Sequence, residues 1–482
     1  MENLEVEKIK TQTTHNILFL TLRNFGIQGI SVIGFFLLTI ILGKGEVGLF
    51  AIVAESIGIL GYFSDVGLAS ALIQQKEEPD KLSLRTTFTV QQILVLLCLI
   101  SVAIFYPHLS QTKGYGSREL WIMLSLCFSF LVASLKTIPS IKLERHLNFK
   151  LISTIDIIEN TLFYVIAVIF AFLGFGVYSY AIATFIKSTV GLIVIYRYSS
   201  WPIGFAFSAK TAKKLFSFGI PFQLNSLIAM AKDRFSNLLV AGILGRDSFG
   251  ILSWAQKGPR IPLSFMDAIM RVTFPTFSRL QDEKEFLRKS LTKSTFFIAL
   301  IVFPSLMGIC LIASDFINLI PKYDKWLPAI IPLYFYAASY AIASVTTPIT
   351  NAFNATGKIK TTTKLMVMWT VLTWIFYPIL SYKFGYIGTA IAALVVGLSS
   401  FVVWYLAYKY FEVNILKTIF HPLVASIVIL IIMLPISYLA LPPLVSIIVK
   451  VFMSVFIYSV YQFAFNRAEL LWFYRQLLKI KK

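Results

Sequence analysis

The chain has 482 residues, of which 57% are hydrophobic and only 14% are charged, whereas about 25% of the residues of a soluble globular protein are charged. The apolar residues recur in blocks of about twenty, the length of a helix that crosses a bilayer, so the composition excludes a soluble protein and predicts an all-α polytopic membrane protein. The net charge of +20 lies mostly in short loops between these blocks, which is typical of membrane topology and not of nucleic-acid binding.

The apolar blocks predict about fourteen transmembrane helices, preceded by a polar interfacial lead at residues 1–21. We expect the spans at residues 22–42, 47–73, 84–107, 117–139, 151–173, 177–198, 214–244, 248–277, 291–313, 326–353, 361–382, 385–408, 419–440 and 443–465. Residues 466–482 form a basic amphipathic tail that we expect at the membrane surface.

Lysine and arginine are distributed unevenly between the two sides of the predicted bundle. The side with both termini carries 28 of them in its loops, and the other side carries seven. Because positively charged loops remain in the cytoplasm, we expect a multi-pass protein of the cytoplasmic membrane with both termini in the cytoplasm.

A short repeat recurs at an offset of 202 residues. Ile41–Gly48, ILGKGEVG, matches Ile243–Gly250, ILGRDSFG, and both are predicted turns between spans. The repeat predicts two pseudo-symmetric six-helix bundles in the same orientation around a central cavity, a plan in which the substrate site lies between the halves. We expect the bundles at 22–198 and 214–408, a linker at 199–213, and two extra helices at 419–465.

The predicted eighth span has a polar stripe along one side. At 100° per residue, six polar residues fall within an arc of roughly 80°: Ser253, Lys257, Arg260, Ser264, Asp267 and Arg271. A charge at the bilayer centre costs roughly 2.5–3.5 kcal/mol on insertion scales, and it usually faces a watery cavity or a partner. The stripe predicts the basic wall of a cavity; the alternative is a packed polar seam in which Asp267 pairs with Arg271.

Further cations are expected at the same depth as the middle of this stripe, about 15 Å from the predicted outer end. Lys232 and Arg234 are about 200° apart on one helix, so we expect one to face the cavity and the other to pair with an acid or a helix neighbour. The candidate residues for binding an anionic substrate are therefore Lys257, Arg260, Lys232, Arg234, Arg271 and Lys187.

Acidic residues occupy matching places in the first half of the chain. Glu55 has the repeat position of Lys257, and Asp65 is in register with Asp267. Such acids are expected to pair with the cations when the cavity is empty, or to hold a coupling H⁺ or Na⁺. The candidate coupling or gating acids are Glu55, Asp65, Asp156, Glu159 and Asp267; the alternative for Asp65 and Asp156 is solvation at the cytoplasmic end.

Three further cations, Arg23, Lys136 and Lys450, lie toward the ends of their spans, and their side chains are expected to reach the nearer interface. The three cysteines and four histidines are scattered without ligand spacing, so neither a metal site nor a catalytic group is predicted. Phosphate-binding glycine loops are also missing from the sequence. Without an ATPase, the energy is expected from H⁺ or Na⁺, from the substrate gradient or from a separate protein, and no other cofactor is predicted.

Two segments of the chain resemble a known family. Phe63–Gln74, FSDVGLASALIQ, and Arg271–Gln281, RVTFPTFSRLQ, are similar to segments of the Wzx-type polysaccharide flippases, with support from Leu42–Ala51 and Gly174–Tyr178. The likeness is to the branch of the multidrug/oligosaccharidyl-lipid/polysaccharide exporter superfamily that includes colanic-acid and teichuronic-acid exporters, and it extends from end to end.

The resemblance implies a transporter and not an enzyme. It would flip an undecaprenyl-diphosphate-linked oligosaccharide from the cytoplasmic to the outer leaflet by alternating access, for export of a cell-surface polysaccharide. Besides this glycan and the bilayer, a polysaccharide polymerase and other assembly proteins are the implied partners. The alternatives are a cation-coupled multidrug exporter of the same superfamily, a membrane-embedded glycosyltransferase or ligase, and a scaffold of an assembly complex.

Overall fold

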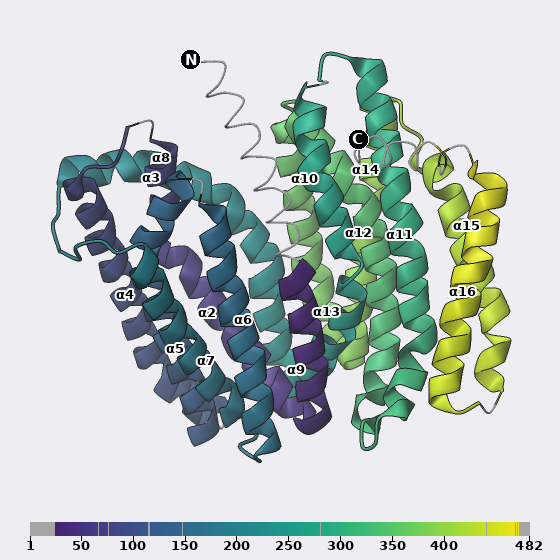
Figure 1. Ribbon diagram of the computed structural model, residues 1–482, viewed down its shortest axis with the longest axis horizontal. Coiled ribbons are helices and arrows are strands. Elements are labelled where there is room, and N and C mark those ends of the chain that lie inside the picture. The colour runs from purple at the N-terminus through teal and green to yellow at the C-terminus, as the bar shows by residue number, and fades with distance from the viewer. Residues whose placement is uncertain are drawn as a thin grey trace. The chain divides into compact units, whose positions relative to one another are not determined.

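The computed structural model describes residues 25–471, except 66, 76, 114–115, 147, 280, 440, 468 and 470. Every regular element within these residues is a helix (Figure 1), so the predicted all-α class is confirmed. The helices form two compact units, unit 1 (Met1–Gly250) and unit 2 (Ile251–Lys482). The predicted lead and the residues from 472 onward lie outside the described residues, and the predicted domain boundaries remain predictions.

Unit 1 starts with the helical residues Phe25–Ile41. Its core joins α3, α4, α5 and α8 through buried side chains such as Leu72, Phe88 and Leu215, and α7 packs along both α5 and α6. Its further elements are α2 (Lys44–Asp65), α3 (Leu68–Gln74), α4 (Lys81–Lys113), α5 (Ser117–Arg145), α6 (Phe149–Phe172), α7 (Tyr178–Tyr198), α8 (Ala209–Met230), the π-helical turn η1 (Ala231–Phe235) and the first part of α9 (Ser236–Arg260).

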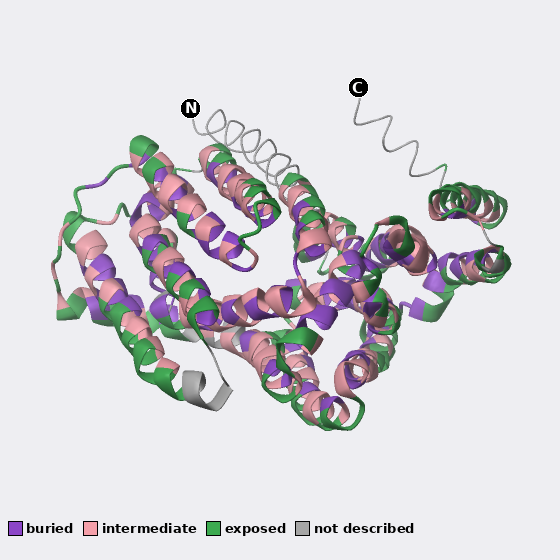
Figure 2. Cartoon of the chain, turned by 90° about the horizontal axis from the view of Figure 1, so that it is seen from below, coloured by how far each residue is buried: buried purple, intermediate pink, exposed green. Residues whose placement is uncertain are grey.

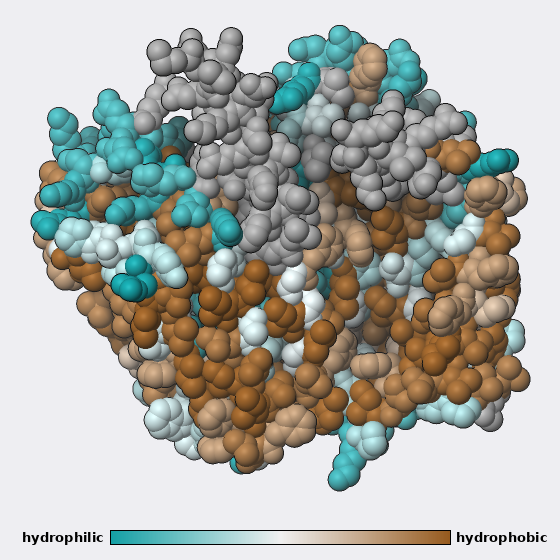
Figure 3. Space-filling model, viewed as in Figure 1, coloured by the Kyte–Doolittle hydropathy of each residue, from teal (hydrophilic) through white to brown (hydrophobic). Residues whose placement is uncertain are grey.

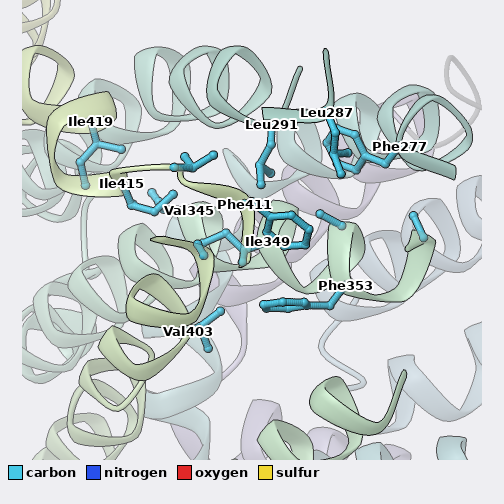
Figure 4. Packing of buried hydrophobic residues seen from close by; sticks show 14 of the residues in the cluster. Phe277, Leu287, Leu291, Val345, Ile349, Phe353, Val403, Phe411, Ile415 and Ile419 are labelled. Atoms are coloured by element: carbon cyan, nitrogen blue, oxygen red, sulfur yellow. The ribbon is translucent and has the colours of Figure 1, made fainter. Parts of the chain in front are cut away.

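Unit 2 contains the rest of α9 and the helices that follow it. An apolar cluster joins α10, α11, α12, α13, α14 and α15 (Figure 4), and α16 packs beside α15 on α11. The elements are α10 (Leu263–Arg279), α11 (Lys284–Leu319), η2 (Asp324–Ala329), α12 (Ile330–Ala355), α13 (Ile359–Leu398), α14 (Phe401–Phe411), α15 (Ile415–Met433), η3 (Pro435–Tyr438) and α16 (Pro443–Phe465).

Polar caps explain where several helices begin. The side chain of Asn148 accepts a hydrogen bond of 3.3 Å from the backbone N–H of Leu151 before α6. Ser208 Oγ accepts one of 3.3 Å from the N–H of Thr211 before α8. Because the first N–H groups of a helix have no partner within it, such caps fix the helix start. Both helices therefore begin before the apolar blocks that predicted them.

Two glycines interrupt long helical stretches at predicted turns. Gly245 in α9 has φ 77° and ψ 176°, and Gly385 in α13 has φ 62° and ψ −145°. This region of positive φ is essentially restricted to glycine. The breaks coincide with the turns expected between the seventh and eighth spans and between the eleventh and twelfth.

The predicted eighth span, by contrast, is not one helix. Residues 261–262 form a turn between α9 and α10, and the N–H of Ile261 bonds to the carbonyl of Gly258 at 3.0 Å. Pro262 has no N–H, and its ring collides with the carbonyl four residues earlier in a regular helix. The angular arc of the polar stripe was derived for an unbroken helix, so it applies to α9 and α10 separately.

The exposed side chains of the helices are largely apolar. Figure 2 shows buried and exposed faces alternating along the helices, and the exposed residues include Phe105, Ile193 and Phe452. On unit 1 the surface over the middle of the helices is brown in Figure 3, and hydrophilic side chains gather near α3 and α8. Apolar patches of this extent face lipid or a partner.

Eleven helices of the described residues are long and apolar enough to cross a membrane, and Phe25–Ile41 forms a shorter apolar helix. Two of the eleven stretches, Leu227–Arg260 and Ile359–Phe411, contain the glycine breaks. The protein is therefore a multi-pass membrane protein. The number of fourteen spans remains a prediction.

Candidate functional site

An ion pair joins α2 to η1 inside unit 1. Arg234 Nη1 lies 3.0 Å from Glu55 Oε2, and Asn237 Nδ2 donates a hydrogen bond of 3.1 Å to Glu55 Oε1. Both oxygens of this carboxylate are therefore engaged. Gly58 makes room for the guanidinium, because a Cβ atom there would lie 2.0 Å from Arg234 Nη1. The π-helical turn that presents Arg234 is a kind of bulge that frequently occurs at functional sites.

This arrangement shows how Lys232 and Arg234 are paired, one of which was expected to pair with an acid or a helix neighbour. Arg234 pairs with an acid of another helix, while Lys232 Nζ lies 3.0 Å from the neighbouring Asp233 Oδ1. Sequence reasoning missed Asn237, although its position one helical turn after Arg234 was a usable signal.

The stripe residues of α9 and α10 share an ionic environment in unit 2. Lys257 is partly buried, whereas Arg260, Asp267 and Arg271 are exposed. Asp267 is close enough to Arg260 and Arg271 for electrostatic interaction, as Lys257 is to Arg260.

The opposite side of α10 is apolar. Met266 and Met270 are buried there against Ile298 and Val302 of α11. The helix therefore packs its sulfur-containing side chains into the unit and turns Asp267 and Arg271 outward. The cavity wall stays a prediction, and the interaction of Asp267 with Arg271 is the one that the polar-seam alternative names.

A second group of charges lies among α5, α6 and α7. Lys136 Nζ is 2.5 Å from Glu159 Oε1, and Lys187 Nζ lies 4.7 Å from the centre of the Phe163 ring. Glu159 and Lys136 both interact electrostatically with Lys187. Glu159, a candidate coupling acid, thus already has a lysine ammonium as its partner.

The expectation that Lys136 reaches the nearer interface stays a prediction. The structure gives this lysine a partner that the sequence did not predict, because its ammonium pairs with Glu159 of α6. The helix α5 continues to Arg145, six residues beyond the predicted end of the span at residue 139.

The expectation that Lys450 reaches the nearer interface is wrong. Its side chain is 3% exposed, and its Nζ lies 2.6 Å from Asp315 Oδ2 and 3.3 Å from the carbonyl oxygen of Leu311. Ser446 Oγ donates to the same carboxylate oxygen at 2.9 Å. The predicted spans leave Asp315 in a loop, but α11 continues to Leu319, which places the acid beside α16.

Two residues named in the sequence analysis fall outside the described part of the chain, namely all of Arg23 and the side chain of Asp65. Asp156 is partly buried on α6 and interacts electrostatically with Glu144. Among the described residues, His, Cys, Asp and Glu form no group of three or more that could hold a metal ion.

Comparison with known proteins identifies relatives of this chain. A family model described as "Polysaccharide biosynthesis protein" matches residues 37–331. The chain is 27% identical to the teichuronic acid biosynthesis protein TuaB of Bacillus subtilis (strain 168) over 55% of each chain. It is 26% identical to the succinoglycan biosynthesis transport protein ExoT of Rhizobium meliloti (strain 1021), over 62% of this chain and 61% of that one.

The fold is similar to that of a solved structure, the lipid II flippase MurJ in an inward closed conformation. The TM-score is 0.78 with 16% identity, and the alignment covers 94% of this chain and 100% of the other. The match to the two curated relatives spans about three fifths of their length or less. Since the family model covers more than half of the sequence, the chain belongs to the polysaccharide biosynthesis protein family.

Proposed function

We propose that the protein is a flippase that moves a polyprenyl-diphosphate-linked oligosaccharide from the cytoplasmic to the outer leaflet by alternating access. Family membership supports a role in polysaccharide biosynthesis. The name of ExoT supports transport, and the MurJ fold is that of a protein named as a flippase of a lipid-linked molecule.

The observation that carries the proposal is the ionic face of α9 and α10. Lys257, Arg260 and Arg271 are presented there by helices whose other side is apolar core. A diphosphate is a permanent anion, and Lys and Arg bind such groups through short, charge-assisted hydrogen bonds. The lipid tail remains in the bilayer while the charged headgroup follows this face.

The Glu55–Arg234 pair supplies a further cation, whose charge is balanced by a carboxylate. A diphosphate that reaches Arg234 competes with the carboxylate of Glu55 for the same guanidinium. The pair keeps Arg234 compensated while no substrate is bound. Substrate binding then releases Glu55, which couples occupancy of the site to a change between α2 and η1.

The cellular setting follows from the same proposal. The excess of Lys and Arg on one side favours the cytoplasmic membrane with both termini in the cytoplasm. Coupling to H⁺ or Na⁺ through one of the acids, and cooperation with a polymerase and other assembly proteins, complete the proposal. The diphosphate-linked glycan is the substrate, with undecaprenol as the carrier.

Alanine substitutions in cells that lack the native copy test this function. A hydrogen bond to a charged group contributes about 1.5–3 kcal/mol, so Lys257→Ala and Arg260→Ala should each lower surface polysaccharide by about tenfold or more. Lys289→Ala is the matched control, because Lys289 is an exposed lysine that pairs with Glu285 at 2.6 Å on α11. Normal polymer from both stripe variants would reject the assignment.

A further inference from the structure

The two copies of the repeated turn meet inside unit 1. A Cβ atom added to Gly48 would lie 1.8 Å from the carbonyl oxygen of Arg246 and 2.7 Å from Gly250 N. A Cβ atom added to Gly250 would lie 2.0 Å from the carbonyl oxygen of Lys44 and 3.1 Å from Gly48 N. Each glycine therefore packs directly against the backbone of the other turn, an approach that a side chain would prevent.

The contact is reciprocal with respect to the repeat. Each glycine meets the carbonyl of the residue four positions before the other glycine, and these residues, Lys44 and Arg246, are themselves repeat equivalents. The next equivalent pair also meets, since a Cβ atom at Gly45 would lie 2.3 Å from Asp247 Oδ1. Equivalent residues touch each other where a local pseudo-two-fold axis passes between them.

Both turns are held in place by carboxylates. Arg246 Nη1 lies 2.8 Å from Oε1 of the buried Glu119 at the start of α5. Glu46 Oε2 accepts a hydrogen bond of 2.8 Å from the N–H of Gly43 in the other turn. The glycine crossing thus joins two braced segments, and small residues at such a crossing let backbones approach closely through weak Cα–H···O contacts.

We propose that the Gly48–Gly250 crossing closes the predicted outer end of the transport path and separates once in each cycle. The inference rests on the proposed function, because a flippase must open toward the outer leaflet. At Gly48 and Gly250 the contact is between backbones, so parting separates no interlocked side chains at these two residues. The ion pair of Arg246 with Glu119 of α5 has to break when the turns part.

Accessibility from outside the cell tests the closure without reference to any substrate. Ser253→Cys is introduced into a chain in which Cys98, Cys127 and Cys310 are replaced by alanine, and intact cells are treated with a membrane-impermeant maleimide. Gly48→Val should wedge the turns apart and raise labelling of residue 253 several-fold. Gly250→Ala is a smaller wedge, with a smaller rise expected, for use where the valine chain fails to reach the membrane.

The matched control is Gly242→Val, which lies on the part of α9 before the Gly245 break with nothing within 4 Å of its added Cβ, and it should leave labelling unchanged. Unchanged labelling in a wedge variant present at wild-type level would overturn the closure. If labelling follows these expectations but Lys257→Ala and Arg260→Ala leave surface polysaccharide at its normal level, the proposed function is rejected and the closure is retained.

Separation of the turns is tested by a disulfide between Gly45→Cys and Asp247→Cys. Oxidation should block labelling of the cysteine at 253, read by mass spectrometry of its peptide, and reductant should restore it. A fully crosslinked chain whose residue 253 is labelled as readily as in the reduced chain would show that the turns need not part.

Discussion

Glu55 and Arg234 are 179 residues apart in the sequence, yet their side chains form an ion pair of 3.0 Å between α2 and η1. The pair connects a helix of the predicted first bundle to the helix that carries the first predicted cations. Its carboxylate stands at the repeat position of Lys257. The same repeat position therefore carries opposite charges in the two halves.

Exchanging the two charges tests whether Arg234 serves only the ion pair or also transport. Arg234→Glu alone should destabilise the protein by about 1 kcal/mol, a value reduced by the partial exposure of both groups. The double variant Glu55→Arg with Arg234→Glu should recover thermal stability in detergent but not polymer export, because the cation then lies on α2. Full recovery of export would show that Arg234 serves pairing alone.

The Lys450–Asp315 pair predicts a large effect on stability far from the ionic face. Removing one partner of a buried pair costs about 3–5 kcal/mol, so Lys450→Met or Asp315→Leu should lower the melting temperature strongly. The double variant should lie near wild type, because apolar side chains of similar size can replace a buried pair. Equal losses in the single and double variants would contradict this pairing.

Gly191 sets the geometry of the other internal pair. A Cβ atom at this position would lie within 2.3 Å of Glu159 Cδ, so Gly191→Ala should displace the carboxylate from Lys136. The expected loss of stability is about 1–3 kcal/mol, measured by thermal unfolding. Gly61→Ala on α2, where nothing lies within 4 Å, is the control. In a Glu159→Ala background the effect of Gly191→Ala should disappear.

The start of α4 gives a dependence on pH. Asp80 Oδ1 accepts a hydrogen bond of 2.8 Å from the N–H of Ser83, and hydrogen bonds from the side chain and backbone of Ser83 hold the pKa of Asp80 below its usual value. A lowered folded-state pKa stabilises the helix start above about pH 4 and loses this effect as the pH falls through the folded-state value. The protection factor of the Leu84 amide, which is its exchange rate compared with that of an unstructured peptide at the same pH, should therefore fall in acid, and Asp80→Asn should remove that dependence.

The sequence predicted the features that local chemistry decides. The glycine breaks at Gly245 and Gly385 and the pairing of one of Lys232 and Arg234 with an acid follow from turn preferences and helix angles. It failed for Lys450, because α11 extends beyond its apolar block as far as Asp315, and it did not find the partner of Lys136, which lies on α6. Their partners, Glu159 and Asp315, come from helices brought together only by packing, which no spacing along the chain encodes.

We propose that the cations on α9 and α10 bind the diphosphate of a lipid-linked glycan as it crosses the bilayer. The most direct measurement reconstitutes the purified protein in liposomes and follows movement of a polyprenyl-diphosphate-linked oligosaccharide between leaflets, with a lectin or glycosidase outside. Wild type should transfer the lipid well above protein-free liposomes, and Lys257→Ala with Arg260→Ala should reduce the rate by about a hundredfold, the effect of two charge-assisted hydrogen bonds. Transfer by wild type no faster than in empty liposomes, or undiminished transfer by the double variant, would contradict the account.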